Sequence, residues 1–327
     1  MSFDSRYSEY VEIIESALGD FLADIPTEHL LEPVQYALTS GGKRIRPVLV
    51  MLCCGAAGGR PVNARWAAIT VEMLHNFTLV HDDIMDKADK RRGRDTVHVK
   101  WNEDTAILAG DAIIPLACLA LLKTESHSRL DEMLAAVSNG IIEVCEGQAL
   151  DLRFERSKNV SIPEYTRMIE LKTARMLVMG ARLGALAADA DSRTMELLCD
   201  FASKIGIAFQ IQDDILDIAA ESTVTGKRRG GDVIEGKKTF LVLKALENAT
   251  EAGDRELLQR FIERHGLPAE EVSAMYDLFV RTGAMRDAEQ AVAELTDEAR
   301  RDLGDLPPSE FVDLLRAYAA MLLNREF

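Results

Sequence analysis

The segment Leu79–Asp86 carries three carboxylates in the spacing Asp82-Asp83-x-x-Asp86, at the end of an apolar run that begins near Ala67. If this run is helical, Asp82 and Asp86 lie one turn apart on one face. Carboxylate oxygens are hard ligands, and Mg²⁺ takes one or two of them while it keeps waters and substrate phosphates. The segment therefore predicts a magnesium platform that grips a diphosphate.

The same pattern recurs 131 residues after Asp82, where Gln210, Asp213, Asp214 and Asp217 share one helix face by their i, i+3, i+4, i+7 spacing. A single copy of such a pattern is usually a solvated helix end. Two copies, each preceded by a long apolar run, suggest two helices that face each other across one cavity. All six aspartates are predicted metal ligands: Asp82, Asp83, Asp86, Asp213, Asp214 and Asp217.

The composition limits the class of protein and of partner. The chain has 327 residues, of which 47% are hydrophobic, and no linker or low-complexity block divides it, so we expect a single domain over residues 1–327. The net charge of -16 argues against nucleic acid, because phosphate backbones select basic surfaces. A local basic run, Lys87–Arg94, still allows a small anionic substrate beside the first acid segment.

Three features of the sequence bear on location and membrane association. The N-terminal segment is polar and carries acids, so it is no signal peptide. The longest apolar stretch, Ala106–Leu122, is interrupted by Asp111 and Pro115, so we expect a buried helix and no stable membrane insertion. The five cysteines show no Cys-x-x-Cys spacing and are expected to be buried free thiols in a reducing cytoplasm: Cys53, Cys54, Cys118, Cys145 and Cys199.

Helical periodicity runs through nearly the whole chain, which predicts an all-α protein. A clear example is 7–22, where apolar residues recur every three or four positions. The only short strand candidate is Thr96–Trp101.

Five motifs in order give the chain its resemblance to the trans-isoprenyl diphosphate synthases, the polyprenyl synthetase family, over essentially its whole length. They are Gly41-Gly42-Lys43-Arg44-Ile45-Arg46-Pro47; His75 ahead of Asp82-Asp83-x-x-Asp86; Arg91-Arg92-Gly93; Lys172-Thr173; and Phe209-Gln210-x-x-Asp213-Asp214-x-x-Asp217 with Lys227 and Lys237 beyond. A single motif is weak evidence, but the ordered set is very specific.

The resemblance implies the isoprenoid synthase fold, in which helices surround a central active-site cavity, and a homodimer. It implies an enzyme, a prenyltransferase, that condenses isopentenyl diphosphate with an allylic diphosphate, head to tail. Three Mg²⁺ ions between the aspartate segments would stabilise the departing diphosphate. The implied catalytic residues are Lys172, Thr173, Gln210, Asp82 and Asp213. Those implied to bind the allylic diphosphate are Arg91, Lys172, Thr173, Gln210, Lys227 and Lys237.

Isopentenyl diphosphate needs a site of its own, and the resemblance assigns it to Lys43, Arg46, His75 and Arg92. Arginine suits this role because its planar fork binds phosphate oxygens in pairs. One departure concerns Asp95, which stands where the family often has proline. It lies beyond the ligands and bears on the shape of the loop.

Product length is implied by the fifth and fourth residues before the first aspartate, here Phe77 and Thr78. Together with an uninterrupted aspartate motif they resemble the archaeal type that makes C20 products. Geranylgeranyl diphosphate is therefore the expected product and farnesyl diphosphate the alternative, followed by a longer-chain product. Helical counting places Phe77 roughly 140° from Asp82, so Phe77 could also be a plain core residue.

Three rival functions share some of these features. A terpene cyclase shares the fold, but its second metal motif is usually based on Asn, Ser and Glu, and it lacks the site of Lys43 and Arg46. A non-catalytic partner subunit tends to lose aspartates, whereas this chain keeps all six. A di-iron bundle needs Glu-x-x-His pairs on two facing helices, and the sequence has only one such pair, Glu72-x-x-His75.

Overall fold

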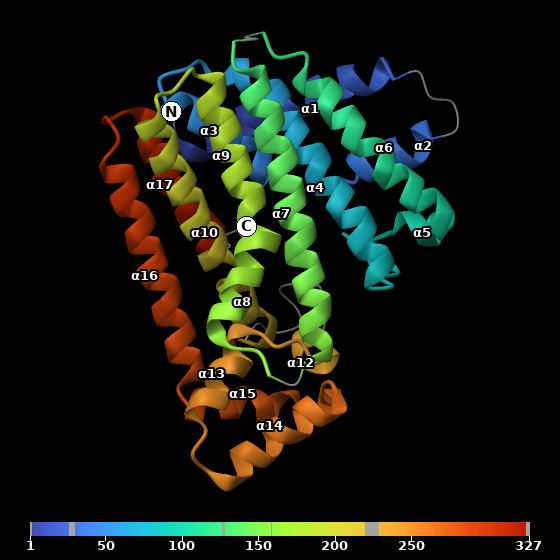
Figure 1. The fold of residues 1–327 in the computed structure, drawn as a ribbon, viewed down its shortest axis with the longest axis vertical. Coiled ribbons are helices and arrows are strands. Elements are labelled where there is room, and N and C mark those ends of the chain that lie inside the picture. Colours follow the sequence, from blue (N-terminus) through green and yellow to red (C-terminus); the bar gives the residue numbers. More distant parts are fainter. Residues whose placement is uncertain (1, 26–29, 126–127, 158, 220–228, 325–327) are drawn as a thin grey trace. The chain divides into compact units, whose positions relative to one another are not determined.

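The computed structural model describes residues 2–25, 30–125, 128–157, 159–219 and 229–324. Within them the chain is a series of α-helices with one short two-stranded hairpin (Figure 1). The prediction of an all-α protein is therefore confirmed. Contacts divide the chain into two compact units. Unit 1 consists of Met1–Ile141, Met176–Cys199 and Leu303–Tyr318, and unit 2 of Ile142–Arg175, Asp200–Asp302 and Ala319–Phe327.

The boundaries between the units fall inside or beside helices rather than in linkers. Among the described residues, five helices have residues in both units: α7 (Leu130–Arg156), α9 (Arg175–Ala187), α10 (Ser192–Ala219), α16 (Ala284–Gly304) and α17 (Glu310–Asn324). A single domain over the whole chain stays a prediction.

Unit 1 is built on two long helices that pack on each other, α4 (Arg65–Met85) and α6 (Glu103–Leu121). Helix α4 is buried along most of its length, and α3 and α1 pack against it. The other elements of this unit are α1 (Phe3–Ala23), α2 (Leu31–Leu38), α3 (Ile45–Ala56), η1 (Pro61–Ala64), β1 (Lys90–Arg91), β2 (Arg94–Asp95), α5 (Val97–Lys100) and α9 (Arg175–Ala187), whose first residue belongs to unit 2.

Unit 2 holds the shorter helices that follow the second aspartate segment, with α8 and α15 both packing on α13. Helix α8 begins with a capping box, in which the Ser161 hydroxyl and the Glu164 carboxylate satisfy each other's backbone N–H groups. The elements of this unit are α8 (Ile162–Ile169), η2 (Glu170–Ala174), α12 (Gly231–Glu235), α13 (Phe240–Asn248), α14 (Ala252–Arg264), η3 (Ala269–Glu271) and α15 (Val272–Arg281).

One expectation about local structure is corrected. The strand candidate Thr96–Trp101 is wrong: Val97–Lys100 is a short helix, and the strands lie just before it. Arg92 and Gly93 form the two-residue turn of the hairpin, both with positive φ (52° and 76°), as a type I′ turn requires. This turn closes the hairpin at Asp95, and Thr96 then takes the N-cap position of the helix.

Burial of the cysteines and of helix α6 is only partial. All five cysteines are free, but Cys145 is exposed and Cys118 is half-buried, so only Cys53, Cys54 and Cys199 match the expectation. Helix α6 is long and apolar enough to cross a membrane by length and composition, and 39% of its most apolar window is buried. One face of α6 packs on α4, while Ile107, Leu108 and Leu119 are exposed.

Candidate active site

The first aspartate segment closes helix α4. Asp82 is half-buried in the last turn, and Asp86 is the exposed C-cap residue. Asp83 differs from both because it is 5% exposed and its Oδ1 accepts a hydrogen bond from Arg91 Nε at 2.7 Å. Burial raises the pKa of the Asp83 carboxyl, and the Arg91 charge opposes this rise. The segment thus presents two accessible carboxylates and one that is neutralised by an arginine of unit 1.

The hairpin brings the two arginines to different partners. Arg91 reaches Asp83, whereas Arg92 Nη1 donates to the carbonyl of Gly41. Gly42 has φ of 134°, a conformation that favours glycine, and a Cβ there would lie 2.5 Å from Arg92 Nη1. The hairpin therefore holds Arg92 against the loop that carries Lys43.

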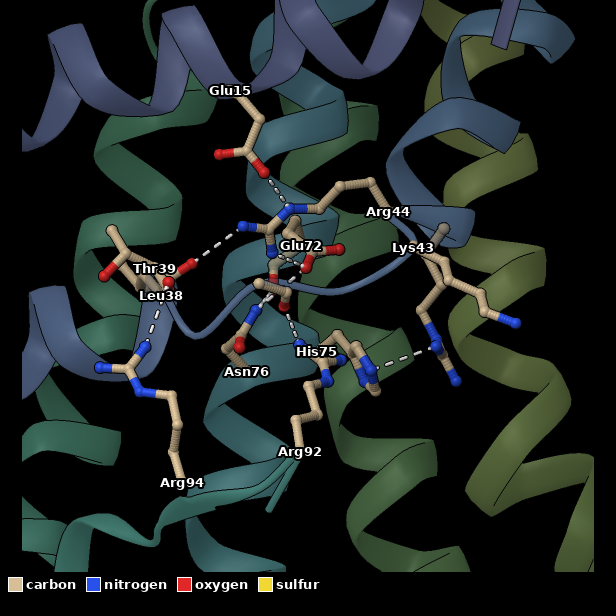
Figure 2. Close-up of polar contacts among 12 residues, drawn as sticks. Glu15, Leu38, Thr39, Lys43, Arg44, Glu72, His75, Asn76, Arg92 and Arg94 are labelled. Carbon is tan, nitrogen blue, oxygen red and sulfur yellow. Dashed lines mark hydrogen bonds and ion pairs between the residues drawn. The ribbon is translucent and has the colours of Figure 1, made fainter. Parts of the chain in front are cut away.

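The predicted ligands of isopentenyl diphosphate lie in one region of unit 1 (Figure 2). Arg46 Nη1 lies 3.1 Å from His75 Nε2, and the carbonyl of Lys43 accepts a hydrogen bond from the Tyr7 hydroxyl. Burial, and then the charges of Arg46 and Arg92, hold the pKa of the His75 ring well below its ordinary value. His75 is therefore neutral, and the positive charge of this region comes from the lysine and the arginines.

The second aspartate segment lies in helix α10, and its middle acid is again the most buried. Asp214 is 4% exposed. Its Oδ2 accepts from the Tyr165 hydroxyl and from Phe240 N at 3.0 Å, and its Oδ1 accepts from Gln210 Nε2 at 3.4 Å. Burial, and then the charge of Asp232, raise the pKa of Asp214 to about 7, although the three hydrogen bonds act in the opposite direction. Asp217 Oδ2 accepts from Asp232 N at 3.0 Å.

A pocket of about 160 Å³ in unit 2 collects most of the residues predicted to bind the allylic diphosphate. Thr173 Oγ1 donates to Gln210 Oε1 at 3.0 Å, which places both oxygens on one wall. Lys172 Nζ lies 2.5 Å from Asp151 Oδ2, and Lys237 Nζ lies 3.5 Å from Asp232 Oδ1. Arg91 belongs to unit 1, and Lys227 lies outside the described residues.

A local irregularity in the backbone sets the direction of Lys172 and Thr173. They lie in η2, a π-helical turn between α8 and α9. Such turns often occur at functional sites, because the extra residue redirects the side chains. The backbone of Lys172 lies so close to Gly147 on α7 that a Cβ there would clash with Lys172 N. Glycine at this position therefore lets the two segments meet.

Three residues of this pocket were missed by sequence reasoning: Asp151, Tyr165 and Asp232. Asp151 lies one turn after Gly147, and a glycine inside a long helical pattern indicates close packing of another backbone. That signal, followed by an acid at i+4, could have found Asp151. No local signal marks Tyr165 or Asp232, since their roles depend on contacts with a distant helix.

The aspartates fit a hard divalent ion by their chemistry. Within the described residues, no group of three or more His, Cys, Asp or Glu side chains is close enough to hold a metal ion alone. Mg²⁺ usually takes one or two carboxylates and completes its shell with waters and substrate phosphates. Asp82 and Asp86, and likewise Asp213 and Asp217, are partly exposed pairs one helical turn apart that suit this mode. Asp83 and Asp214 already have protein donors, so an ion would have to share their oxygens.

Comparison with known proteins decides the family. The family model described as polyprenyl synthetase matches residues 27–279. The chain belongs to the polyprenyl synthetase family. This enzyme is a prenyltransferase, and its all-α architecture is the isoprenyl synthase fold.

Individual relatives agree with the family assignment. The enzyme is 38% identical over 319 residues to a short chain isoprenyl diphosphate synthase of Methanothermobacter thermautotrophicus, covering 97% of both chains. Its structure matches that of a geranylgeranyl pyrophosphate synthetase from Pyrococcus horikoshii with a TM-score of 0.92 and 33% identity, covering 99% and 98% of the two chains. A geranylgeranyl pyrophosphate synthase from Corynebacterium glutamicum, complexed with isoprenyl diphosphate and magnesium, matches with a TM-score of 0.87 and 27% identity over 100% of both chains.

Proposed function

We propose that the enzyme uses Mg²⁺ to condense isopentenyl diphosphate with allylic diphosphates, head to tail, and that its main product is geranylgeranyl diphosphate. The observation that carries this proposal is the existence of two diphosphate sites of different character. The pocket of unit 2 is lined by three lysines and three aspartates: Lys172, Lys237, Lys238, Asp151, Asp214 and Asp232. The pair Asp213 and Asp217, which suits a divalent ion, lies on α10 of the same unit. The second set, Lys43, Arg46, His75 and Arg92 of unit 1, is basic. The site of unit 2 suits the allylic diphosphate, whose diphosphate group must leave. The site of unit 1 suits isopentenyl diphosphate, whose diphosphate group is only held.

The allylic substrate loses its diphosphate to give an allylic cation, and the residues of unit 2 support this step. Lys172 and Lys237 would contact the departing diphosphate as cations. Thr173 Oγ1 and Gln210 Oε1, joined by their hydrogen bond, present oxygens to the developing positive charge. When bound, Mg²⁺ would stabilise the negative charge that builds up on the leaving group, and electrostatic stabilisation of this kind is a large catalytic term.

Isopentenyl diphosphate would be held by the basic set of unit 1. The guanidinium of Arg46 and a neutral His75 can both donate to phosphate oxygens, and neither offers the oxygen ligands that Mg²⁺ prefers. The double bond of this substrate attacks the allylic cation, the new C–C bond forms, and a proton is lost to the released diphosphate. This route requires no protein base, which agrees with the lack of an obvious Ser/His/Asp or Cys/His constellation in the sequence.

Phe77 supports the assignment of product length. Its side chain is 7% exposed and packs edge-on against the ring of His81, with 4.9 Å between the centroids. The smaller Thr78 turns its hydroxyl back to the carbonyl of His75 at 2.8 Å. The family resemblance places Phe77 at the end of the tail pocket, where its aromatic ring would stop the growing chain at C20, and farnesyl diphosphate is the alternative product.

A homodimer is proposed from the exposed apolar residues of unit 1. Ile107, Leu108, Leu119, Leu122 and Leu134 are between 38% and 53% exposed, and four of them come from α6 or the residue that follows it. Exposed apolar residues gathered in this way mark an interaction surface. Light scattering after gel filtration should give twice the chain mass, and Leu108→Glu should give a monomer. We also propose a cytoplasmic location.

The function is tested by incubating the enzyme with labelled isopentenyl diphosphate, Mg²⁺ and dimethylallyl, geranyl or farnesyl diphosphate in turn. We expect labelled C20 diphosphate, and none when EDTA replaces Mg²⁺. A terpene cyclase would release diphosphate without taking up label, and a partner subunit would be inactive alone.

Phe77→Ala should lengthen the product by at least one C5 unit, and an unchanged product would contradict the role of Phe77.

A further inference from the structure

Arg44 lies between the predicted ligands Lys43 and Arg46, yet it belongs to the protein interior. It is 3% exposed and has a left-handed backbone with φ of 51°. A residue with a Cβ adopts this conformation only at a cost, and it persists where the surrounding structure holds it. In Figure 2 the side chain of Arg44 extends inward, toward Glu15 and Glu72, while Lys43 extends to the other side of the loop.

The guanidinium of Arg44 joins three helices of unit 1 at one point. Its Nε donates to Glu15 Oε1 of α1 at 2.6 Å, its Nη1 donates to Glu72 of α4, and its Nη2 donates to the carbonyl of Leu38 in α2 at 3.2 Å. Only arginine offers donors in such a fork, so lysine cannot reproduce these contacts. The three bonds fix the start of helix α3 in position.

Glu72 is the buried partner and connects this junction to the proposed isopentenyl diphosphate site. It is 3% exposed, and its Oε1 also accepts from Asn76 Nδ2 at 3.2 Å. Its own helix carries His75 one turn later, and His75 contacts Arg46 at 3.1 Å. Glu72 therefore connects the loop, through Arg44, to the helix that carries His75.

We propose that Arg44 and Glu72 are positioning residues for the isopentenyl diphosphate site. Their buried ion pair holds the loop so that Lys43 and Arg46 lie beside His75. Neither residue touches the substrate, because Arg44 points away from the side of the loop that Lys43 occupies. This inference rests on the proposed function of Lys43, Arg46 and His75 as ligands of isopentenyl diphosphate.

The decisive variant replaces both members, Arg44→Met together with Glu72→Met. Replacing a buried ion pair by apolar residues of similar volume is often neutral for stability, whereas removing one partner leaves an uncompensated charge. We expect the double variant to keep the melting temperature. We also expect its Kd for isopentenyl diphosphate alone, measured by calorimetry, to rise ~10- to 100-fold, as for the loss of a charged hydrogen bond. The KM for the allylic partner should stay within about twofold.

A matched control removes a half-buried ion pair of unit 2, Lys204–Asp302 (2.6 Å), by Lys204→Met with Asp302→Leu. This control should leave the affinity for isopentenyl diphosphate unchanged. A folded Arg44→Met, Glu72→Met enzyme with wild-type affinity would overturn the inference. If that variant does not fold, Arg44→Lys is the test, because it keeps the positive charge and removes the forked donors of the guanidinium. Arg44→Lys should weaken isopentenyl diphosphate binding with the allylic KM retained, and equal affinity would refute the proposal.

Failure of the inference and failure of the proposed function give different results. If the wild-type enzyme binds no isopentenyl diphosphate and forms no C–C bond, the proposed function is wrong. If the wild-type enzyme does both and the double variant binds equally well, only the role of Arg44 and Glu72 is wrong.

Discussion

The two aspartate segments have the same sequence pattern but different surroundings. In the first, the buried middle acid, Asp83, is paired with the cation Arg91. In the second, the buried middle acid, Asp214, has only neutral donors in contact, and its pKa rises to about 7. The outer aspartates of each segment are thus the ones kept partly exposed, while each middle acid is buried and bonded to other elements of its own unit.

The largest expected effect comes from the outer acids of either segment. Asp82→Ala and Asp213→Ala should each lower kcat by at least ~10²–10³, the usual effect of losing one charge-stabilising group in a transition state. Steady-state assays with saturating Mg²⁺ measure this, and circular dichroism checks the fold. Near-normal turnover of either variant would contradict the prediction that the outer aspartates of both segments have the same role.

The next largest effect should be specific to one substrate: substitutions in unit 1 should affect isopentenyl diphosphate, and substitutions in unit 2 should affect the allylic diphosphate. Arg92→Ala should raise the KM for isopentenyl diphosphate roughly 10- to 100-fold, since a charged hydrogen bond contributes ~1.5–3 kcal/mol. Lys172→Ala should act on the allylic substrate and on kcat instead. Initial rates with each substrate varied in turn distinguish the two outcomes, and equal effects on both substrates would show that the sites are wrongly assigned.

The middle acids should differ in their dependence on pH. The pKa of Asp214 is raised from 3.8 to about 7. Between these two pH values the Asp214 carboxyl therefore keeps its proton in the folded protein and releases it in the unfolded chain. The free energy of unfolding contributed by Asp214 should therefore fall as the pH rises from about 4 to about 7, and then stay constant. Urea unfolding in EDTA at several pH values should show this loss in the wild type and not in Asp214→Asn. The same slope in both proteins would mean that Asp214 ionises normally.

The smallest effect concerns two tyrosines, one near each segment. Tyr165→Phe removes a donor from buried Asp214 and should lower the free energy of unfolding by about 1–3 kcal/mol. Tyr36→Phe is the matched control, since its hydroxyl donates to the carbonyl of Asp95 at 2.8 Å in an exposed place. Loss of that bond should cost under about 1 kcal/mol. Equal losses in urea unfolding would contradict the difference in burial.

The sequence by itself determined the helices, the two aspartate segments and the basic motifs between them. Helical spacing is local, so it is enough to place Asp82 near Asp86 and Asp213 near Asp217 on one face. The order of the motifs also determined the family, which the matching family model confirms over residues 27–279.

Only the tertiary structure decided which groups are buried and what holds them. Asp83 and Asp82 are neighbours with the same chemistry, and the hairpin that delivers Arg91 distinguishes them. Arg44 could have been a third ligand beside Lys43, but its contact with Glu72, 28 residues away along the chain, turns it inward. Burial and hydrogen-bond partners depend on segments that are distant in sequence, and no local pattern contains that information.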